Sequence, residues 1–250
     1  MENYYDINLP SFSSLKNLER SPAHYLASKS VKKKTYAMDL GNAIHTSILE
    51  PDLFSSRFEI KLNGRSKEGR EQAAAIIGTD IMLLKDDDYN NCLTIREHLF
   101  KQNGIKNLLT GSAEKEYFYE IDGVQVKSKL DLVTDKYIVD LKTCEDASPS
   151  KFTHNFINYH YYAQAYMYQL AEAKTSGEIK PYFIMALEKE PPFEFRIYSV
   201  NDFWLQAGRS TIERWISIFK KCTEKNEWPG YERGVTDLVP PQWFINKEVL

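Results

Sequence analysis

The stretch that decides the fold is VKSKLDLVTDKYIVDLKTCE, residues 126–145. Its apolar residues alternate with others as in a buried sheet, and a turn at residues 134–136 separates two strands. Asp131, Asp140 and Lys142 nevertheless lie inside these runs. A charge inside a sheet costs several kcal/mol unless it is paired or binds a metal ion. These residues therefore either make ordinary turns and surface pairs or belong to a sheet that holds a cation.

The pattern around this stretch predicts further strands. The first ends at Asp122-Gly123, a strong hairpin signal. A long helix over 150–173 follows the third strand, and Asn201 or Asp202 can cap another that runs to about Glu224. The five strands are expected at residues 115–121, 124–133, 137–143, 181–189 and 193–200.

The first part of the chain favours helices, which are expected over residues 11–29 (interrupted by Pro22), 39–50, 65–78 and 86–102. The fold class is therefore α/β or α+β, with a central five-stranded mixed sheet flanked by helices. We expect one domain over residues 1–250. It comprises a mainly helical portion at 1–110, a sheet core at 111–225 and an irregular tail at 226–250.

Composition narrows the class of protein. The chain has 250 residues, 42% of them hydrophobic, and a net charge of -3, so no global basic field points to nucleic acid. A local basic groove around an acidic metal site remains compatible with this balance. Cys92, Cys144 and Cys222 are too few and too far apart for a disulfide framework or a four-cysteine metal site. These cysteines fit a reducing cytoplasm best, so we expect a cytoplasmic protein. We expect no membrane partner, because no apolar run could span a bilayer. The chain also begins with no signal-peptide pattern.

The charged residues of the opening stretch suit phosphodiester hydrolysis. Ile138, Asp140 and Lys142 share one face of their strand, and the hairpin can bring Asp131 close to Asp140. Two carboxylates that face one point repel each other unless a cation lies between them, and Mg²⁺ prefers such oxygen ligands. A neighbouring lysine can orient water or offset charge in the transition state. The alternative is that Asp131 ends a strand and the other two lie on a solvated edge.

The segment LDLVTDKYIVDLKT resembles the signature of PD-(D/E)-x-K nucleases, with Leu130 in place of the usual proline. Gln164 and Tyr168 match the Q-x-x-x-Y motif of the RecB-like branch, and residues 41–45 match its G-x-x-x-H helix. Over residues 11–200 the ordered set of motifs is similar to the RecE (exonuclease VIII) type of phage-derived nuclease.

The resemblance implies a role for each matching position. Asp131 and Asp140 would be metal ligands, with the Leu141 carbonyl as a third, and His45 would complete the metal shell. Lys142 would be the catalytic lysine. From helical spacing alone, His45 would instead be a histidine of the hydrophobic core.

Other positions receive weaker assignments. The resemblance implies that Gln164 and Tyr168 organise the site or contact DNA, although at i, i+4 they could simply hydrogen-bond each other. Glu114 matches an acidic position of the family or is a surface charge. The remaining candidates are basic residues that either grip DNA phosphates or form solvated surface: Arg65, Lys67 and Arg70, with the run at 32–34 favoured as a solvated loop.

The activity that the resemblance implies is a Mg²⁺-dependent DNA exonuclease, with Mn²⁺ as a substitute. It would digest linear double-stranded DNA 5′-to-3′ and leave 3′ single strands for recombination and repair. A homo-oligomer and a single-strand annealing protein as partner are also implied. The open alternatives are a RecB-like nuclease of different polarity or structure preference, a catalytically silent DNA-binding module, and a purely structural protein.

Overall fold

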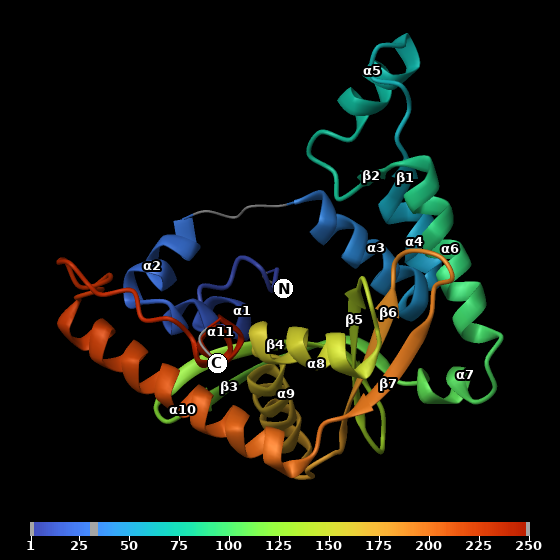
Figure 1. Ribbon diagram of the computed structural model, residues 1–250. Helices are drawn as coiled ribbons and strands as arrows, with labels where there is room; N and C mark the ends of the chain where they lie inside the picture. The colour runs from blue at the N-terminus through green and yellow to red at the C-terminus, as the bar shows by residue number, and fades with distance from the viewer. Residues whose placement is uncertain (1–2, 31–34, 249–250) are drawn as a thin grey trace.

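The computed structural model describes residues 3–30 and 35–248 (Figure 1). The predicted basic loop at 32–34 lies outside these residues. Within them, no helix is both long and apolar enough to cross a membrane. The N-terminal part contains α1 (Phe12–Leu15), η1 (Lys16–Glu19), α2 (Pro22–Ser30), α3 (Tyr36–Leu49), α4 (Pro51–Arg57), β1 (Phe58–Ile60), α5 (Lys67–Ala75), β2 (Met82–Leu84), α6 (Asp86–Phe100) and α7 (Ile105–Leu108).

The remainder of the chain builds the main sheet and the helices around it. Its elements are β3 (Ser112–Ile121), β4 (Val124–Val133), β5 (Ile138–Cys144), α8 (Pro149–Asn158), α9 (Tyr161–Ser176), β6 (Tyr182–Glu188), β7 (Phe195–Ser199), α10 (Asp202–Lys225) and α11 (Gln242–Glu248).

The main sheet has the strand order β3-β4-β5-β6-β7. β5 and β6 are parallel, and the other neighbouring strands are antiparallel. Parallel strands need a long crossover, which α8 and α9 supply here. Asp122 and Gly123 join β3 to β4 with φ values of 46° and 77°, as a tight hairpin requires. The predicted five-stranded mixed sheet flanked by helices is confirmed.

Helices cover both faces of this sheet, and a hydrophobic core fills each side (Figure 1). Trp215 and Tyr182 belong to the core that the sheet shares with α1, α9 and α10. Ile44 and Leu99 belong to the opposite core, which joins the sheet to α3, α4 and α6. The central strands β5 and β6 are therefore buried on both faces, so a charged side chain on them lies against an apolar layer.

The helix expected over 150–173 is in fact two helices, α8 and α9, because the chain turns at His160. The φ of His160 is 58°, in the left-handed region, which a right-handed helix cannot continue. Residues 11–29 are likewise divided into α1, η1 and α2, and Pro22 begins α2. Proline fits the first turn of a helix because its missing N–H has no helical acceptor there.

Several short elements were not predicted from the sequence, among them the helices α4 and α7. β1 and β2 form a separate parallel pair of three residues each, too short to produce a readable alternation. The tail, expected to be irregular, contains α11.

A buried carboxylate on α9 ties this helix to the sheet. Glu172 is 1% exposed and accepts a hydrogen bond from Tyr117 of β3. Its Oε1 lies 2.8 Å from Lys180 Nζ, just before β6, and its Oε2 lies 3.4 Å from Lys115 Nζ of β3. Lys180 Nζ also donates to the Thr134 carbonyl at 2.8 Å. One side chain therefore holds β3, α9 and the approach to β6 together.

Glu172→Ala is expected to lower the free energy of unfolding by about 3 kcal/mol, because Lys180 loses a buried partner and Tyr117 an acceptor. Urea denaturation followed by circular dichroism measures this change. Glu178, an exposed carboxylate just beyond the same helix, gives a matched control, and Glu178→Ala is expected to stay within about 0.5 kcal/mol of the parent. Equal stability of the two variants would contradict the anchoring role.

Candidate functional site

β4 and β5 separate at the site. Their backbones pair at Leu132–Val139 and at Val133–Ile138. Beyond these pairs, the Leu141 amide, two residues after Val139, donates to the carboxylate Oδ2 of Asp131 at 2.8 Å. The side chain of Asp131 therefore accepts a hydrogen bond from a backbone N–H that has no backbone partner on β4. This bond holds the carboxylate at the point where the two strands diverge.

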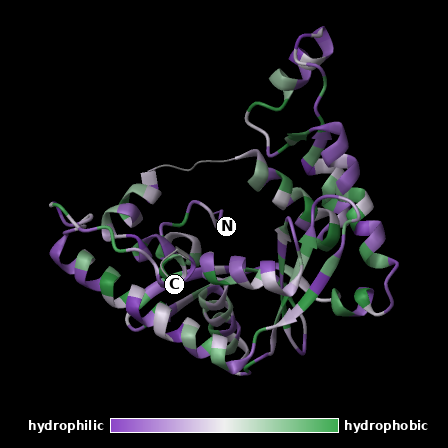
Figure 2. Cartoon of the chain, in the orientation of Figure 1, coloured by the Kyte–Doolittle hydropathy of each residue, from purple (hydrophilic) through white to green (hydrophobic). Residues whose placement is uncertain are grey.

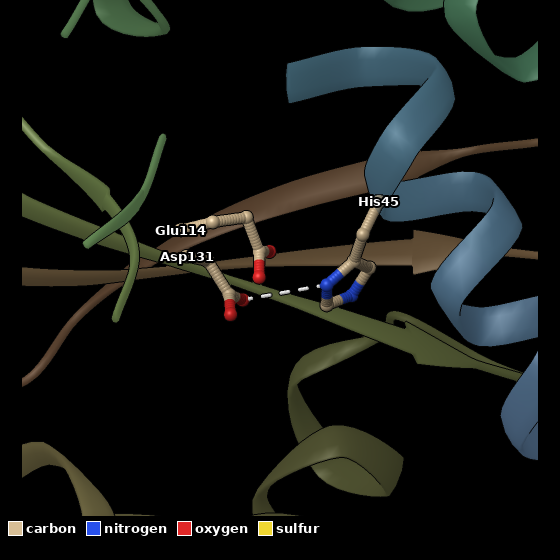
Figure 3. A group of neighbouring side chains, drawn as sticks. All are labelled: His45, Glu114 and Asp131. Carbon is tan, nitrogen blue, oxygen red and sulfur yellow. Dashed lines mark ion pairs between the residues drawn. The ribbon is translucent and has the colours of Figure 1, made fainter. Parts of the chain in front are cut away.

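Three side chains from different elements converge at this point. His45 of α3, Glu114 of β3 and Asp131 of β4 offer ligand atoms that all lie within 4.8 Å of one another. His45 Nδ1 is 3.6 Å from Asp131 Oδ2, and all three side chains point toward one another in Figure 3. One imidazole nitrogen and two carboxylates in this arrangement could hold a divalent cation.

Glu114 reaches this group through an irregularity in β3. It lies opposite Asp131, between the pairs Ala113–Leu132 and Lys115–Leu130, and its φ of 52° is unusual for a residue other than glycine. Strained backbone of this kind occurs preferentially where a side chain must be aimed at a functional position. The sequence analysis left Glu114 open between a family position and a surface charge, and the structure brings it to the site.

Asp140 and Lys142 lie beside the three converging side chains. Asp140 is 1% exposed and forms an ion pair with Lys142, whose Nζ is 5.0 Å from the centre of the Tyr161 ring. Asp140 is not part of the group within 4.8 Å, although its charge acts on both Asp131 and His45. The geometry therefore pairs Asp131 with Glu114 and His45, and Asp140 with Lys142.

Burial changes the protonation of these groups. Burial and the Lys142 ammonium lower the pKa of His45 to about 4, so the ring is neutral at pH 7. Burial raises the pKa of Asp131 to about 6 and also raises that of Asp140. Burial disfavours the charged form of Lys142, but the carboxylates of Asp140 and Asp131 outweigh this effect and raise its pKa. The lysine is consequently charged at neutral pH.

The site opens into a cleft of about 610 Å³. Gln164 and Tyr168, one turn apart on α9, lie in its wall, and a hydrogen bond between their side chains lowers the otherwise strongly raised pKa of Tyr168. Leu141 contributes its backbone, because the His45 ring hydrogen-bonds to the Leu141 carbonyl. Besides His45, Glu114 and Asp131, the cleft is lined by residues 4–9, 11–14, 28–29 and 127–129 and by Asn42.

The predicted DNA-contacting basic residues lie elsewhere. Arg65, Lys67 and Arg70 belong to α5 and the loop before it, which project from the rest of the chain in Figure 1 and are mostly hydrophilic in Figure 2. Arg70 donates to the Arg65 carbonyl at 2.7 Å, and Lys67 pairs with Glu71. None of the three lines the cleft, so DNA contact by these residues stays a prediction.

Comparison with known families identifies the chain. A family model described as a PDDEXK-like domain of unknown function (DUF3799) matches residues 11–237. The chain belongs to this family. Membership confirms the PD-(D/E)-x-K part of the resemblance and supports a nuclease, whereas the RecE-type assignment stays a prediction.

Among solved structures, the PDDEXK-like chain is similar to a protein from Eubacterium rectale that is described as a candidate exonuclease. The TM-score is 0.68 at 16% sequence identity, over 99% of this chain and 97% of the other, which shows a shared fold. SSO0001 gives a TM-score of 0.30 at 16% identity over 81% of this chain and 84% of its own, too low to carry an argument. No curated protein matches.

Two features of the site were missed from the sequence. Lys129 Nζ lies 2.9 Å from Glu114 Oε2, and alternation along β4 would have placed this lysine on the same face as Asp131. The segment at residues 3–10 lines the cleft through residues 4–9, yet it has no periodic pattern that could have indicated this position. Lys129 and this segment therefore extend the predicted set of residues.

Asp131→Asn is expected to raise the free energy of unfolding at pH 7 by up to about 3 kcal/mol in a chelating buffer. The variant removes a partly buried charge, and its amide oxygen can still accept the Leu141 N–H. The pKa of Asp131 is about 6 in the folded protein against an ordinary 3.8. The contribution of this carboxyl to the free energy of unfolding of the parent therefore falls as pH rises from about 3.8 to about 6.

The gain should therefore be present at pH 7 and nearly absent at pH 4, where the folded carboxyl is protonated in the parent. Urea denaturation at the two pH values measures the difference. A gain of equal size at both would show that the charge of Asp131 is not the cause.

Proposed function

We propose that this protein is a divalent-metal-dependent deoxyribonuclease, and that a single domain over residues 1–250 carries the activity. The observation that carries the proposal is the convergence of His45, Glu114 and Asp131 at a cleft, with the Asp140–Lys142 pair beside them. Membership of a PDDEXK-like family supports the same chemistry.

The side chains present fit Mg²⁺, with Mn²⁺ as a substitute. Glu114 and Asp131 offer the carboxylate oxygens that these ions prefer, and each raises the energy of the other's charge. A cation between them would remove this repulsion. His45 has a lowered pKa and is therefore in the neutral form that binds metals. The Leu141 carbonyl and the carboxylate of Asp140 are further oxygen ligands in the proposed shell.

Different residues of the site are proposed to have different roles in the cleavage of the phosphodiester bond. The bound ion would polarise a phosphoryl oxygen and lower the pKa of the attacking water. Lys142 retains its proton, so its ammonium can offset the negative charge that develops on the phosphate. Asp140 holds that ammonium in place through the ion pair. Gln164 and Tyr168 brace the wall of the cleft and are proposed to organise the site or contact DNA.

We further propose that the enzyme digests linear double-stranded DNA from its ends, 5′-to-3′, and leaves 3′ single strands for recombination and repair. The resemblance to RecE-type nucleases supports this polarity, a homo-oligomer, an annealing protein as partner and a cytoplasmic location. The description of the Eubacterium rectale neighbour as a candidate exonuclease supports dependence on DNA ends. Arg65, Lys67 and Arg70 are the proposed contacts to DNA outside the cleft.

Linear duplexes labelled at the 5′ or the 3′ end, together with closed circular DNA, test the activity directly. With Mg²⁺ we expect linear DNA to be digested, the 5′ label to be released first and circular DNA to stay intact, whereas a chelator stops all digestion. Earlier release of the 3′ label would overturn the polarity. Linear DNA that is bound but left uncut with Mg²⁺ and with Mn²⁺ would favour a silent DNA-binding module.

Lys142→Ala is expected to slow cleavage at least about 100-fold, because the ammonium acts on charge that develops in the transition state. Removal of a positive charge beside the carboxylates should not weaken Mg²⁺ binding, which titration calorimetry measures. Lys142→Arg keeps a cationic partner for Asp140 and serves as the folding control. A folded Lys142→Ala protein with parental turnover would refute the assigned role.

A further inference from the structure

The segment at residues 3–10 forms one wall of the cleft through residues 4–9. Lys127 of β4 holds the segment there, and Lys29 of α2 adds a hydrogen bond to the Asn8 side chain at 3.3 Å. Lys127 Nζ donates to the carbonyls of Tyr4 at 2.5 Å and Ile7 at 2.7 Å. The Lys127 backbone amide donates to the Pro10 carbonyl at 2.9 Å. Lys127 is 6% exposed, so its ammonium lies beneath this segment and fixes it against the sheet. The wall is therefore a built part of the site.

Two adjacent tyrosines in this wall have opposite environments. Tyr4 is 8% exposed, and its ring lies 4.4 Å from Lys127 Nζ, so it anchors the segment. Tyr5 is 63% exposed and lines the cleft. The two rings are nearly perpendicular, at 89°, with centres 5.4 Å apart. This contact leaves most of the Tyr5 ring accessible from the cleft.

Tyr5 is also connected to the proposed metal ligands. Lys129 Nζ lies 5.5 Å from the centre of the Tyr5 ring and 2.9 Å from Glu114 Oε2. A single ammonium therefore links the exposed ring to the group formed by His45, Glu114 and Asp131. A group that rests on Tyr5 would be one side chain away from the reacting phosphate.

We propose that Tyr5 is a stacking surface for an unpaired nucleobase of the DNA strand held in the cleft. This inference rests on the proposed nuclease function and names the part of the substrate that the wall recognises. Aromatic rings bind the faces of bases without regard to sequence, whereas cationic side chains hold the backbone. Lys29, exposed in the same cleft, supplies a cation of that kind.

An acidic side chain in the same wall disfavours the sugar–phosphate backbone on the Tyr5 ring itself. Asp6 is exposed in the same wall, and its carboxylate repels phosphate. A neutral base face meets no such repulsion at the Tyr5 ring. Other strongly exposed aromatic residues of the described chain, such as Phe203, Tyr231 and Trp243, do not line the cleft. Tyr5 thus differs from these exposed aromatic residues because its ring lies in the wall of the cleft.

The test measures equilibrium binding in a Lys142→Ala background with Mg²⁺, so that DNA is retained uncut. Fluorescence anisotropy compares a labelled short single strand with a blunt duplex of the same length. Tyr5→Ala should weaken binding of the single strand about tenfold and affect the blunt duplex less, because stacking requires an unpaired base. Tyr5→Phe should bind as the parent, because it retains the ring.

Two further variants separate stacking from other effects. Tyr231 is 66% exposed and lies outside the cleft, so Tyr231→Ala is the matched control and should bind as the parent. Tyr5→Leu keeps apolar bulk without a ring and should lose affinity as Tyr5→Ala does. If Tyr5→Ala lowers the melting temperature, Tyr5→Leu is the variant that tests stacking, because it keeps the apolar bulk of the side chain. A strand with 2-aminopurine near its end reports stacking independently, and its fluorescence change on binding should disappear with Tyr5→Leu.

Unchanged single-strand affinity in Tyr5→Ala and Tyr5→Leu, with a parent that binds DNA, would overturn the stacking role and leave the nuclease proposal standing. An equal loss for single strand and blunt duplex would also overturn it, since a general defect of the wall would then be the cause. A parent that binds no DNA under any of these conditions would overturn both proposals.

Discussion

The hydrogen bond from the Leu141 amide to the Asp131 carboxylate is the interaction on which the site depends. It stands where β4 and β5 stop pairing, so it satisfies a backbone donor that would otherwise lie unpaired inside the sheet. The same bond fixes a carboxylate at the gap between the two strands. His45 of α3 and Glu114 of β3 can then approach that carboxylate, because no backbone ladder occupies the space.

The sheet and the motif residues could be predicted from local sequence patterns. Which charged side chains converge at the site could not be predicted in this way. Alternation along residues 137–143 places Asp140 and Lys142 on one face, and Asp122-Gly123 marks the hairpin. The sequence pairs Asp131 with Asp140, whereas the structure places Glu114 beside Asp131 and turns Asp140 toward Lys142. The separation of β4 from β5 and the positive φ of Glu114 arise from long-range packing, which no local pattern contains.

The helix α9 connects the stability of the fold to the shape of the site. Gln164, Tyr168 and Glu172 follow one another at intervals of four residues and so share one helix face. The first two line the cleft, and the third holds Lys115 and Tyr117 of β3. Because Glu114 immediately precedes Lys115, the anchor of β3 also fixes the strand from which Glu114 reaches the site. The contacts of Glu172 thus stabilise the fold and also fix the position of Glu114, a proposed metal ligand.

Lys129 extends this dependence from the ligands to the substrate wall. Without a cation, its ammonium pairs with Glu114 at 2.9 Å and offsets part of the repulsion between Glu114 and Asp131. A divalent ion held by these carboxylates would repel the ammonium and weaken its pairing with Glu114. The ammonium would then be available to the backbone phosphate next to the base stacked on the Tyr5 ring, which the ammonium already approaches. Metal loading and substrate contact would in this way act on one side chain, and its charge would couple the wall to the site.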